Sequence, residues 1–178
     1  MVLLAKSGLG SMNRWFQNRK GFTLVELLVV MGIIAALFGL ATINLVKTQH
    51  NASVSAASDG LLSDIRGQQT KAMSGTNDGT GSGNSYGIYF PPSSPGTYIL
   101  FRGTVYSASD TTNFSVAPTA ITFSNNLPNN SLVFSQRSGE FYGYTTGPYT
   151  ITVANAYGTE SKTITINKYG VVSNITTP

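Results

Sequence analysis

The apolar and polar positions divide this chain into an uncharged N-terminal run, an amphipathic stretch and a long region of alternation. From residue 27 to residue 46 no side chain carries a formal charge. A run of about 20 residues spans about 30 Å as a helix, which is the thickness of the hydrocarbon core of a bilayer. The first stretch therefore predicts a transmembrane helix.

Beyond Lys47 the chain becomes polar, but apolar side chains recur at helical spacing. They are Val54, Ala57, Leu61, Ile65 and Ala72, with Leu62 and Met73 beside them. We therefore expect one helix from about residue 23 to about residue 73, whose second half packs its apolar stripe against a sheet. The charged residues of this half are interpreted as its solvated face: Asp59, Asp64, Arg66 and Lys71.

Residues 74–84, SGTNDGTGSGN, have the composition of a flexible linker that ends the helix. Residues 85–178 read as short strands separated by turn residues. The expected strands are 86–90, 98–106, 120–124, 131–135, 149–155, 162–167 and 171–175. Tyr169 and Gly170 suit a tight turn before the last strand. The pattern predicts an α+β fold, in which a long N-terminal helix packs on a C-terminal antiparallel β domain.

Aromatic residues concentrate in the segment FYGYTTGPY at 141–149. Such residues can form a surface that binds a partner, but in a small β domain they more often fill the core and cover its edges. We therefore expect this segment to belong to the core.

One acidic residue, Glu26, lies at the head of the uncharged run. A carboxylate at bilayer depth costs roughly 2.5–3.5 kcal/mol at the centre of a span, and less near its end. Such a residue needs a partner. The segment before it carries Lys6, Arg14, Arg19 and Lys20 and no acid, which places the amino end in the cytoplasm by the positive-inside rule.

The residues around this acid, KGFTLVE at 20–26, together with the apolar run, resemble the leader of type IV pilins and type II secretion pseudopilins. In that family a membrane aspartyl peptidase cuts after the glycine and methylates the new amino terminus. The resemblance implies cleavage between Gly21 and Phe22, N-methylation of Phe22, and an assembly role for Glu26. The carboxylate can neutralise the new amine of its own or a neighbouring subunit when helices stagger into a filament. Met12 as the first residue would give a shorter leader than Met1, closer to the family's usual form.

The resemblance also implies a division of the chain. The parts are a prepilin leader at 1–21, the transmembrane and assembly half of the helix at 22–46, its amphipathic half at 47–73, the linker at 74–84 and an extracytoplasmic β domain at 85–178. The segments LLSDIRGQQTKAM and TITINKYGVVSNI further resemble the H-type minor pseudopilins, the GspH and FimT group.

The function implied is that of a pilin-like minor subunit of a type IV pilus or of a type II secretion pseudopilus. Such a subunit passes once through the inner membrane and carries its β domain outside the cytoplasm. The implied partners are the prepilin peptidase and methyltransferase, other pilin or pseudopilin subunits, the inner-membrane assembly platform and membrane lipid.

Charge and residue usage argue against other functions. The chain has 11 Lys and Arg against 7 Asp and Glu, but its surplus of basic residues lies in the leader, so nucleic-acid binding loses its main support. Cysteine is absent, and the one histidine is His50. Neither a Cys/His or Ser/His/Asp nucleophile nor a His/Cys metal site can be assembled from this set. We therefore expect a protein that is not an enzyme and has no cofactor or metal.

Two alternatives stay open at this point. A DNA-binding minor pilin for natural transformation would need basic residues such as Arg102, Arg137 and Lys162 to converge through folding. A stand-alone, membrane-anchored β protein with an adhesive surface would retain its leader.

Overall fold

The computed structural model describes residues 21–75 and 84–177, without the side chains of residues 42–47. Within these residues, the helix α1 (Leu24–Ser74) is followed by eight strands and a short 3-10 turn (Pro128–Asn130). The strands are β1 (Tyr86–Tyr89), β2 (Tyr98–Arg102), β3 (Phe114–Val116), β4 (Ile121–Asn125), β5 (Ser131–Phe134), β6 (Tyr149–Asn155), β7 (Ser161–Ile166) and β8 (Val172–Thr176). This arrangement confirms the predicted α+β class.

The chain forms two compact units, Met1–Ile43 and Asn44–Pro178. The described part of the first unit consists of residues 21–23 and the apolar half of α1. The second unit contains the rest of α1 and all of the described strands. The interior of the expected linker, residues 76–83, lies outside the described residues.

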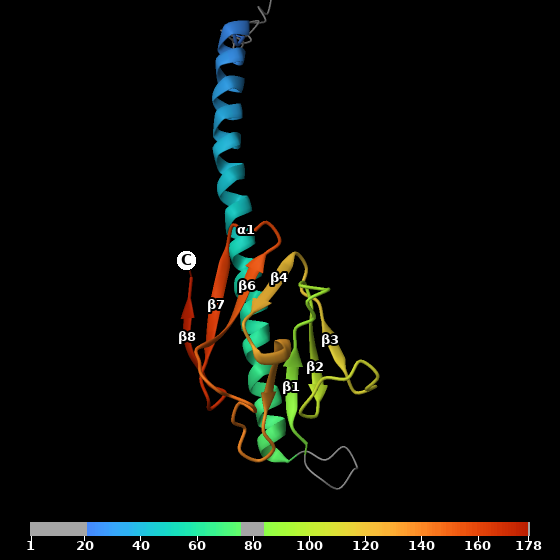
Figure 1. Cartoon of the computed structure of the whole chain (residues 1–178). Helices are drawn as coiled ribbons and strands as arrows, with labels where there is room; N and C mark the ends of the chain where they lie inside the picture. The colour runs from blue at the N-terminus through green and yellow to red at the C-terminus, as the bar shows by residue number, and fades with distance from the viewer. Residues whose placement is uncertain (1–20, 76–83, 178) are drawn as a thin grey trace, which may run out of the picture. The chain divides into compact units, whose positions relative to one another are not determined.

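The strands form two antiparallel sheets (Figure 1). Sheet A has the order β3-β2-β1-β5, and sheet B has the order β4-β6-β7-β8. The sheet B strands β6 and β7 form an antiparallel pair, with Ile151 opposite Ile164 and both side chains fully buried. Alternation places the intervening threonines on the other face, where the hydroxyls of Thr152 and Thr163 lie 3.1 Å apart.

The second half of α1 supplies the centre of the core. The predicted stripe is buried at Val54, Ala57, Leu61, Leu62, Ile65 and Ala72. These side chains pack against apolar residues of both sheets, including Ile88 on β1 and Ile166 on β7. The expectation is wrong for Met73, which is 54% exposed because it follows Ala72 directly and so lies to one side of the buried stripe.

Two hairpin turns share the sequence pattern N-x-Y-G. In each turn a glycine with positive φ donates its N–H to the asparagine carbonyl three residues earlier, Gly158 to Asn155 and Gly170 to Asn167, both at 3.0 Å. The asparagine side chains also bind the turns, since Oδ1 of Asn167 accepts from the N–H of Tyr169 at 3.0 Å. The turn predicted at Tyr169 and Gly170 is confirmed.

The aromatic segment at 141–149 belongs largely to the core, as expected. Phe141 is buried, and its ring makes edge contacts with the half-buried Tyr144 and Tyr149 at centroid distances of 5.8 and 5.2 Å. Tyr142 is half exposed and lies outside this group.

The strand prediction missed β3, and it made the strand beginning at Tyr98 too long. The structure ends that strand at Arg102, before Gly103, whose φ is +110°. β3 has three residues, and Phe114 and Ser115 in it are exposed. An edge strand of this length has no alternating apolar pattern by which the sequence could reveal it.

Candidate functional site

The start of α1 positions the residues that the sequence singled out. Thr23 caps the helix: its Oγ1 accepts a hydrogen bond from the backbone N–H of Glu26 at 3.2 Å, and its carbonyl accepts from the N–H of Leu27 at 3.1 Å. Threonine is a favoured residue at this position because its hydroxyl binds an otherwise unpaired N–H group. Glu26 therefore lies in the first turn, where a carboxylate also interacts favourably with the positive end of the helix dipole.

Every side chain of α1 from residue 24 to residue 41 is exposed within the single chain. The span Leu24–Ala41 is long and apolar enough to cross a membrane, and none of it is buried. Exposed patches of this size mark a surface that contacts lipid or other protein chains. Among the residues that the structure describes, no cation lies within ion-pair distance of Glu26.

Gly21 and Phe22 precede the first turn and have no regular secondary structure. Phe22 is 79% exposed, and a Cβ added at Gly21 would contact nothing within 4 Å. The peptide bond between them is thus accessible in the chain. Residues 1–20 of the expected leader lie outside the described residues.

In the second unit, one of the residues expected on the solvated face of the helix has a different role. Asp64 is half-buried, and its Oδ2 accepts a hydrogen bond from the Tyr98 hydroxyl at 2.7 Å. Burial, followed by the bond to this carboxylate, raises the pKa of Tyr98 well above its ordinary value. The expectation is wrong for Asp64 because Tyr98, only 2% exposed, packs from β2 against the helix.

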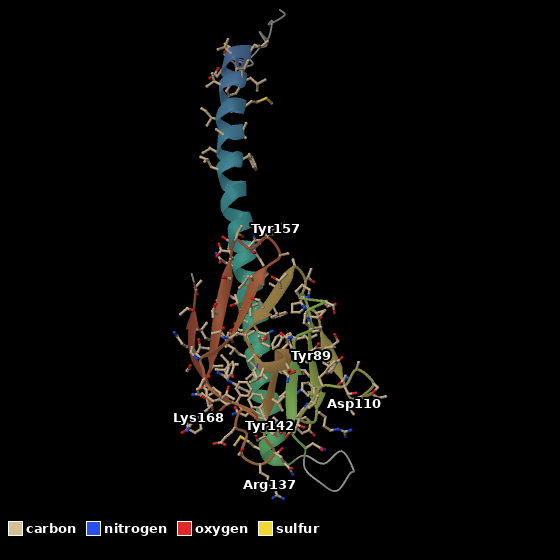
Figure 2. The ribbon with its side chains drawn as sticks, in the orientation of Figure 1. Tyr89, Asp110, Arg137, Tyr142, Tyr157 and Lys168 are labelled. Atoms are coloured by element: carbon tan, nitrogen blue, oxygen red, sulfur yellow. The ribbon has the colours of Figure 1, made fainter. Side chains whose placement is uncertain are left out.

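The basic residues weighed for DNA binding come from separate places. Arg102 is on β2 of sheet A and Lys162 is on β7 of sheet B, whereas Arg137 is in the turn after β5. Nη2 of Arg102 lies 3.9 Å from Oδ2 of Asp110. Figure 2 shows Asp110 on the side of sheet A where β3 lies, and Arg137 near the end of α1. The backbone N–H of Arg137 donates to the Ala72 carbonyl at 2.9 Å, so the turn that carries Arg137 packs against the last turn of α1.

The described residues contain no group of three or more His, Cys, Asp and Glu side chains that could hold a metal ion. His50 is half-buried, and its ring stacks on Tyr157 with centroids 5.3 Å apart. Two hydrogen bonds from Thr112 hold the pKa of Asp110 below its usual range. The His50 ring and the Asp110 carboxylate thus each have a structural partner, Tyr157 and Thr112 respectively.

In a comparison with protein families, the prokaryotic N-terminal methylation motif matches the chain over residues 16–42. No curated protein and no solved structure matches the chain. The matched motif covers Gly21, Phe22 and Glu26 and most of the exposed apolar helix.

The fold and the motif together define a class of protein. This chain is an α+β, pilin-like protein whose N-terminal helix carries the prokaryotic N-terminal methylation motif. The motif implies a structural protein that is not an enzyme, processing by a prepilin peptidase and assembly with pilins. Together with the apolar helix, it indicates a single pass through the inner membrane.

Proposed function

We propose that this protein is a minor subunit of a type IV pilus or of a type II secretion pseudopilus. Its leader is removed between Gly21 and Phe22, Phe22 is methylated on its new amine, and α1 then joins the helices of other subunits. The observation that carries the proposal is Glu26, a carboxylate in the first turn of α1, within the apolar span Leu24–Ala41 of which no residue is buried.

The physical argument is that cleavage creates a positive charge where an uncompensated negative charge already exists. The new amine at residue 22 would lie in the apolar layer within about one helical turn of Glu26. Two opposite unit charges roughly 4 Å apart attract by about 4 kcal/mol at an effective dielectric constant of about 20. That attraction offsets the roughly 2.5–3.5 kcal/mol that a carboxylate costs at the centre of a span.

Assembly uses the same helix surface. Gly32 with Ala36 and Ala35 with Gly39 form small-xxx-small pairs, which allow helices to approach closely in lipid. A Cβ added at Gly32 or Gly39 would contact nothing within 4 Å, so in the single chain both positions are open to a neighbouring helix. The basic leader keeps the amino end cytoplasmic, and the β domain lies on the opposite side of the inner membrane.

Cleavage and methylation are tested together by the intact mass of the protein extracted from the membranes of a bacterium that has a prepilin peptidase. We expect the mass of a chain that begins at Phe22 plus one methyl group. Gly21→Leu should keep the leader, whereas Gly32→Leu, a matched glycine change inside the helix, should be processed normally. Recovery of the native protein with its leader intact would reduce the proposal to an ordinary membrane-anchored domain.

The role of Glu26 is tested by its incorporation into filaments. Glu26→Ala leaves the amine without its partner, so incorporation relative to the membrane pool should fall at least about tenfold, which corresponds to 1.4 kcal/mol. Quantitative immunoblotting of sheared filaments measures this ratio. Glu140→Ala removes an exposed glutamate from the β domain and should incorporate normally. Equal incorporation of the Glu26 and Glu140 variants would show that the pairing argument is wrong.

A further inference from the structure

A cavity of about 450 Å³ lies on the outer face of sheet A, the face opposite the one that packs on α1. Its floor comes from neighbouring strands, because Tyr89 on β1 pairs directly with Ser131 on β5, and Val133 lies two positions further along β5 on the same face. Ile88, next to Tyr89 on β1, faces the other way into the core. Ser131 and Val133 are buried. The volume is within the range of roughly 300–1,000 Å³ of small-molecule sites.

Two loops form the walls of this cavity, and each is attached to the sheet by contacts of its own. In the loop after β2, the Tyr106 ring stacks on the Tyr89 ring, with the planes 13° apart and the centroids 4.1 Å apart. Tyr106 also makes an edge contact with Phe101 of β2, at a centroid distance of 5.7 Å. In the loop after β5, the backbone N–H of Tyr142 donates to the Val133 carbonyl at 2.8 Å. Because these contacts fix the walls relative to the floor, the cavity is formed before a ligand binds.

The Tyr142 ring is an exposed aromatic surface of this cavity. The side chain is half exposed, and it stacks on no other aromatic ring of the described chain, whereas the nearby Tyr144 packs on Phe141. Val105, from the other wall, is 77% exposed. The face of an aromatic ring carries partial negative charge, so it attracts C–H groups that a neighbouring oxygen has polarised. The Tyr142 ring can therefore stack on a ligand that has a flat face of such C–H groups.

The polar groups around the cavity are uncharged, and several have no hydrogen-bond partner in the described chain. They are the hydroxyls of Tyr89, Thr104, Tyr106 and Tyr142 and the side-chain amide of Asn129. By contrast, the hydroxyl of the core residue Tyr98 is paired with Asp64. The backbone of Asn129 has a φ of 52°, and its carbonyl accepts from the Ser131 hydroxyl at 3.1 Å, so the residue is held in place while its amide stays available. Hydroxyls and amides can both donate and accept, and no charged residue is among the described residues that line the cavity.

We propose that this cavity binds a neutral saccharide. A sugar ring has both of the properties that the cavity requires, namely a face of polarised C–H groups and hydroxyl groups around its edge. The C–H face stacks on the Tyr142 ring. The sugar hydroxyls form hydrogen bonds with the Asn129 amide and with the hydroxyls of Tyr89 and Tyr106, in place of the water that these exposed groups bind in the free protein. The absence of charge in the described lining matches a ligand that carries none.

Two other ligands that use aromatic surfaces fit these observations less well. A proline-rich peptide packs on exposed aromatic rings, but proline has no N–H group, so such a peptide brings mainly acceptors to a site whose amide and hydroxyl oxygens need donors as well. Nucleic acid needs cations for its phosphates, and none is among the described lining residues. The inference does not depend on cleavage of the leader or on entry into a filament, so it can fail while the proposed function holds, and the reverse.

The test uses the full chain in phosphatidylcholine nanodiscs, prepared without glycoside detergents, and the neutral disaccharides lactose, maltose and cellobiose. Saturation-transfer NMR of the sugar ring protons gives an apparent Kd and shows which face of the ring touches the protein. We expect at least one of these sugars to bind through the C–H protons of one face. Sorbitol has similar hydroxyls but no ring, and it should bind at least about tenfold more weakly, which corresponds to 1.4 kcal/mol. No transfer to any of the sugars at about 10 mM, or equal transfer to sorbitol, would overturn the proposal.

Variants of exposed residues locate the site without disturbing the core. Tyr142→Ala removes the stacking ring and should raise the Kd of the bound sugar at least about fivefold, whereas Tyr142→Phe keeps the ring and should retain most of the affinity. Asn129→Gly removes the amide at a positive φ that glycine accepts, and it should raise the Kd several-fold. Tyr169→Ala removes a tyrosine that is similarly exposed but does not line the cavity, and it should leave the Kd unchanged. If Tyr169→Ala weakens binding as much as Tyr142→Ala, or if hexaproline displaces the sugar at a concentration below the Kd of that sugar, the cavity is not a saccharide site.

Discussion

The buried amide of Gln68 makes an unusual stability prediction, namely that an apolar replacement should stabilise the protein. Its Oε1 is buried without a partner, and an unsatisfied buried acceptor costs about 1–3 kcal/mol. Its Nε2 makes one hydrogen bond, which at 3.3 Å is longer than the usual range and contributes at most about 1 kcal/mol. Gln68→Met keeps the length of the side chain and removes both groups. We expect the free energy of unfolding to rise by about 1 kcal/mol.

Two further variants define the reason for this change. Gln68→Ala also removes the unpaired oxygen, but it leaves a cavity against Ile65 and the sheet, so it should destabilise by roughly 1–3 kcal/mol. Gln68→Glu places a carboxylate opposite the Gly87 carbonyl and should destabilise most, since a buried charge without a partner is strongly unfavourable.

Urea unfolding of the full chain in detergent, followed by tyrosine fluorescence, measures these differences. In a chain of this size 1 kcal/mol also corresponds to a change of about 2–4 °C in Tm. If Gln68→Met loses 1 kcal/mol or more, the oxygen must be satisfied in the folded protein, and the argument from its burial would be refuted.

Two other changes test contacts in the β domain. Tyr98→Phe removes the hydrogen bond to Asp64 and should cost about 1–3 kcal/mol near neutral pH. Because the folded state raises the pKa of Tyr98, the unfolded chain releases the proton first as pH rises above about 10. Stability should fall in that range, and the fall should be smaller in Tyr98→Phe; equal alkaline profiles from pH-jump unfolding would contradict this. Gly170 and Gly158 both have positive φ, so an alanine at either position is held in a left-handed conformation. The added Cβ lies 2.6 Å from the Phe134 ring in Gly170→Ala but meets nothing within 4 Å in Gly158→Ala. Gly170→Ala should therefore lower the free energy of unfolding by about 1–3 kcal/mol more than Gly158→Ala does. Equal Tm values for the two variants would show that the Phe134 ring moves away from the added methyl group without loss of stability.

The helix and most strands could be predicted because their patterns are local. Apolar spacing identified the buried stripe of α1. Alternation identified β6 and β7, because successive side chains of a strand point to opposite faces of the sheet, so the apolar positions alone show which face is buried. The motif at 20–26 was equally readable, since a glycine, a phenylalanine and a carboxylate lie within one short segment ahead of an uncharged run.

The contacts between α1 and sheet A had no comparable pattern in the sequence. Gln68 lies on α1, whereas Gly87, whose carbonyl accepts from its amide, follows the linker on β1, and Gln68 looks like an ordinary surface residue in its own segment. Asp64 was misread for the same reason, because its partner Tyr98 is 34 positions away in the chain. Helical spacing predicts which side of a helix a residue occupies, but it does not predict which residues of the sheet contact that side.

The sequence by itself determined that this chain has an apolar, uncharged helix with one carboxylate at its head, because length, charge and short-range spacing are properties of contiguous residues. Only the tertiary structure decided which polar groups are buried and which of them lack partners. That outcome depends on strand order and register, which place Gly87 on β1 and Tyr98 on β2 where they meet Gln68 and Asp64 of α1, and these pairings join residues far apart in the chain.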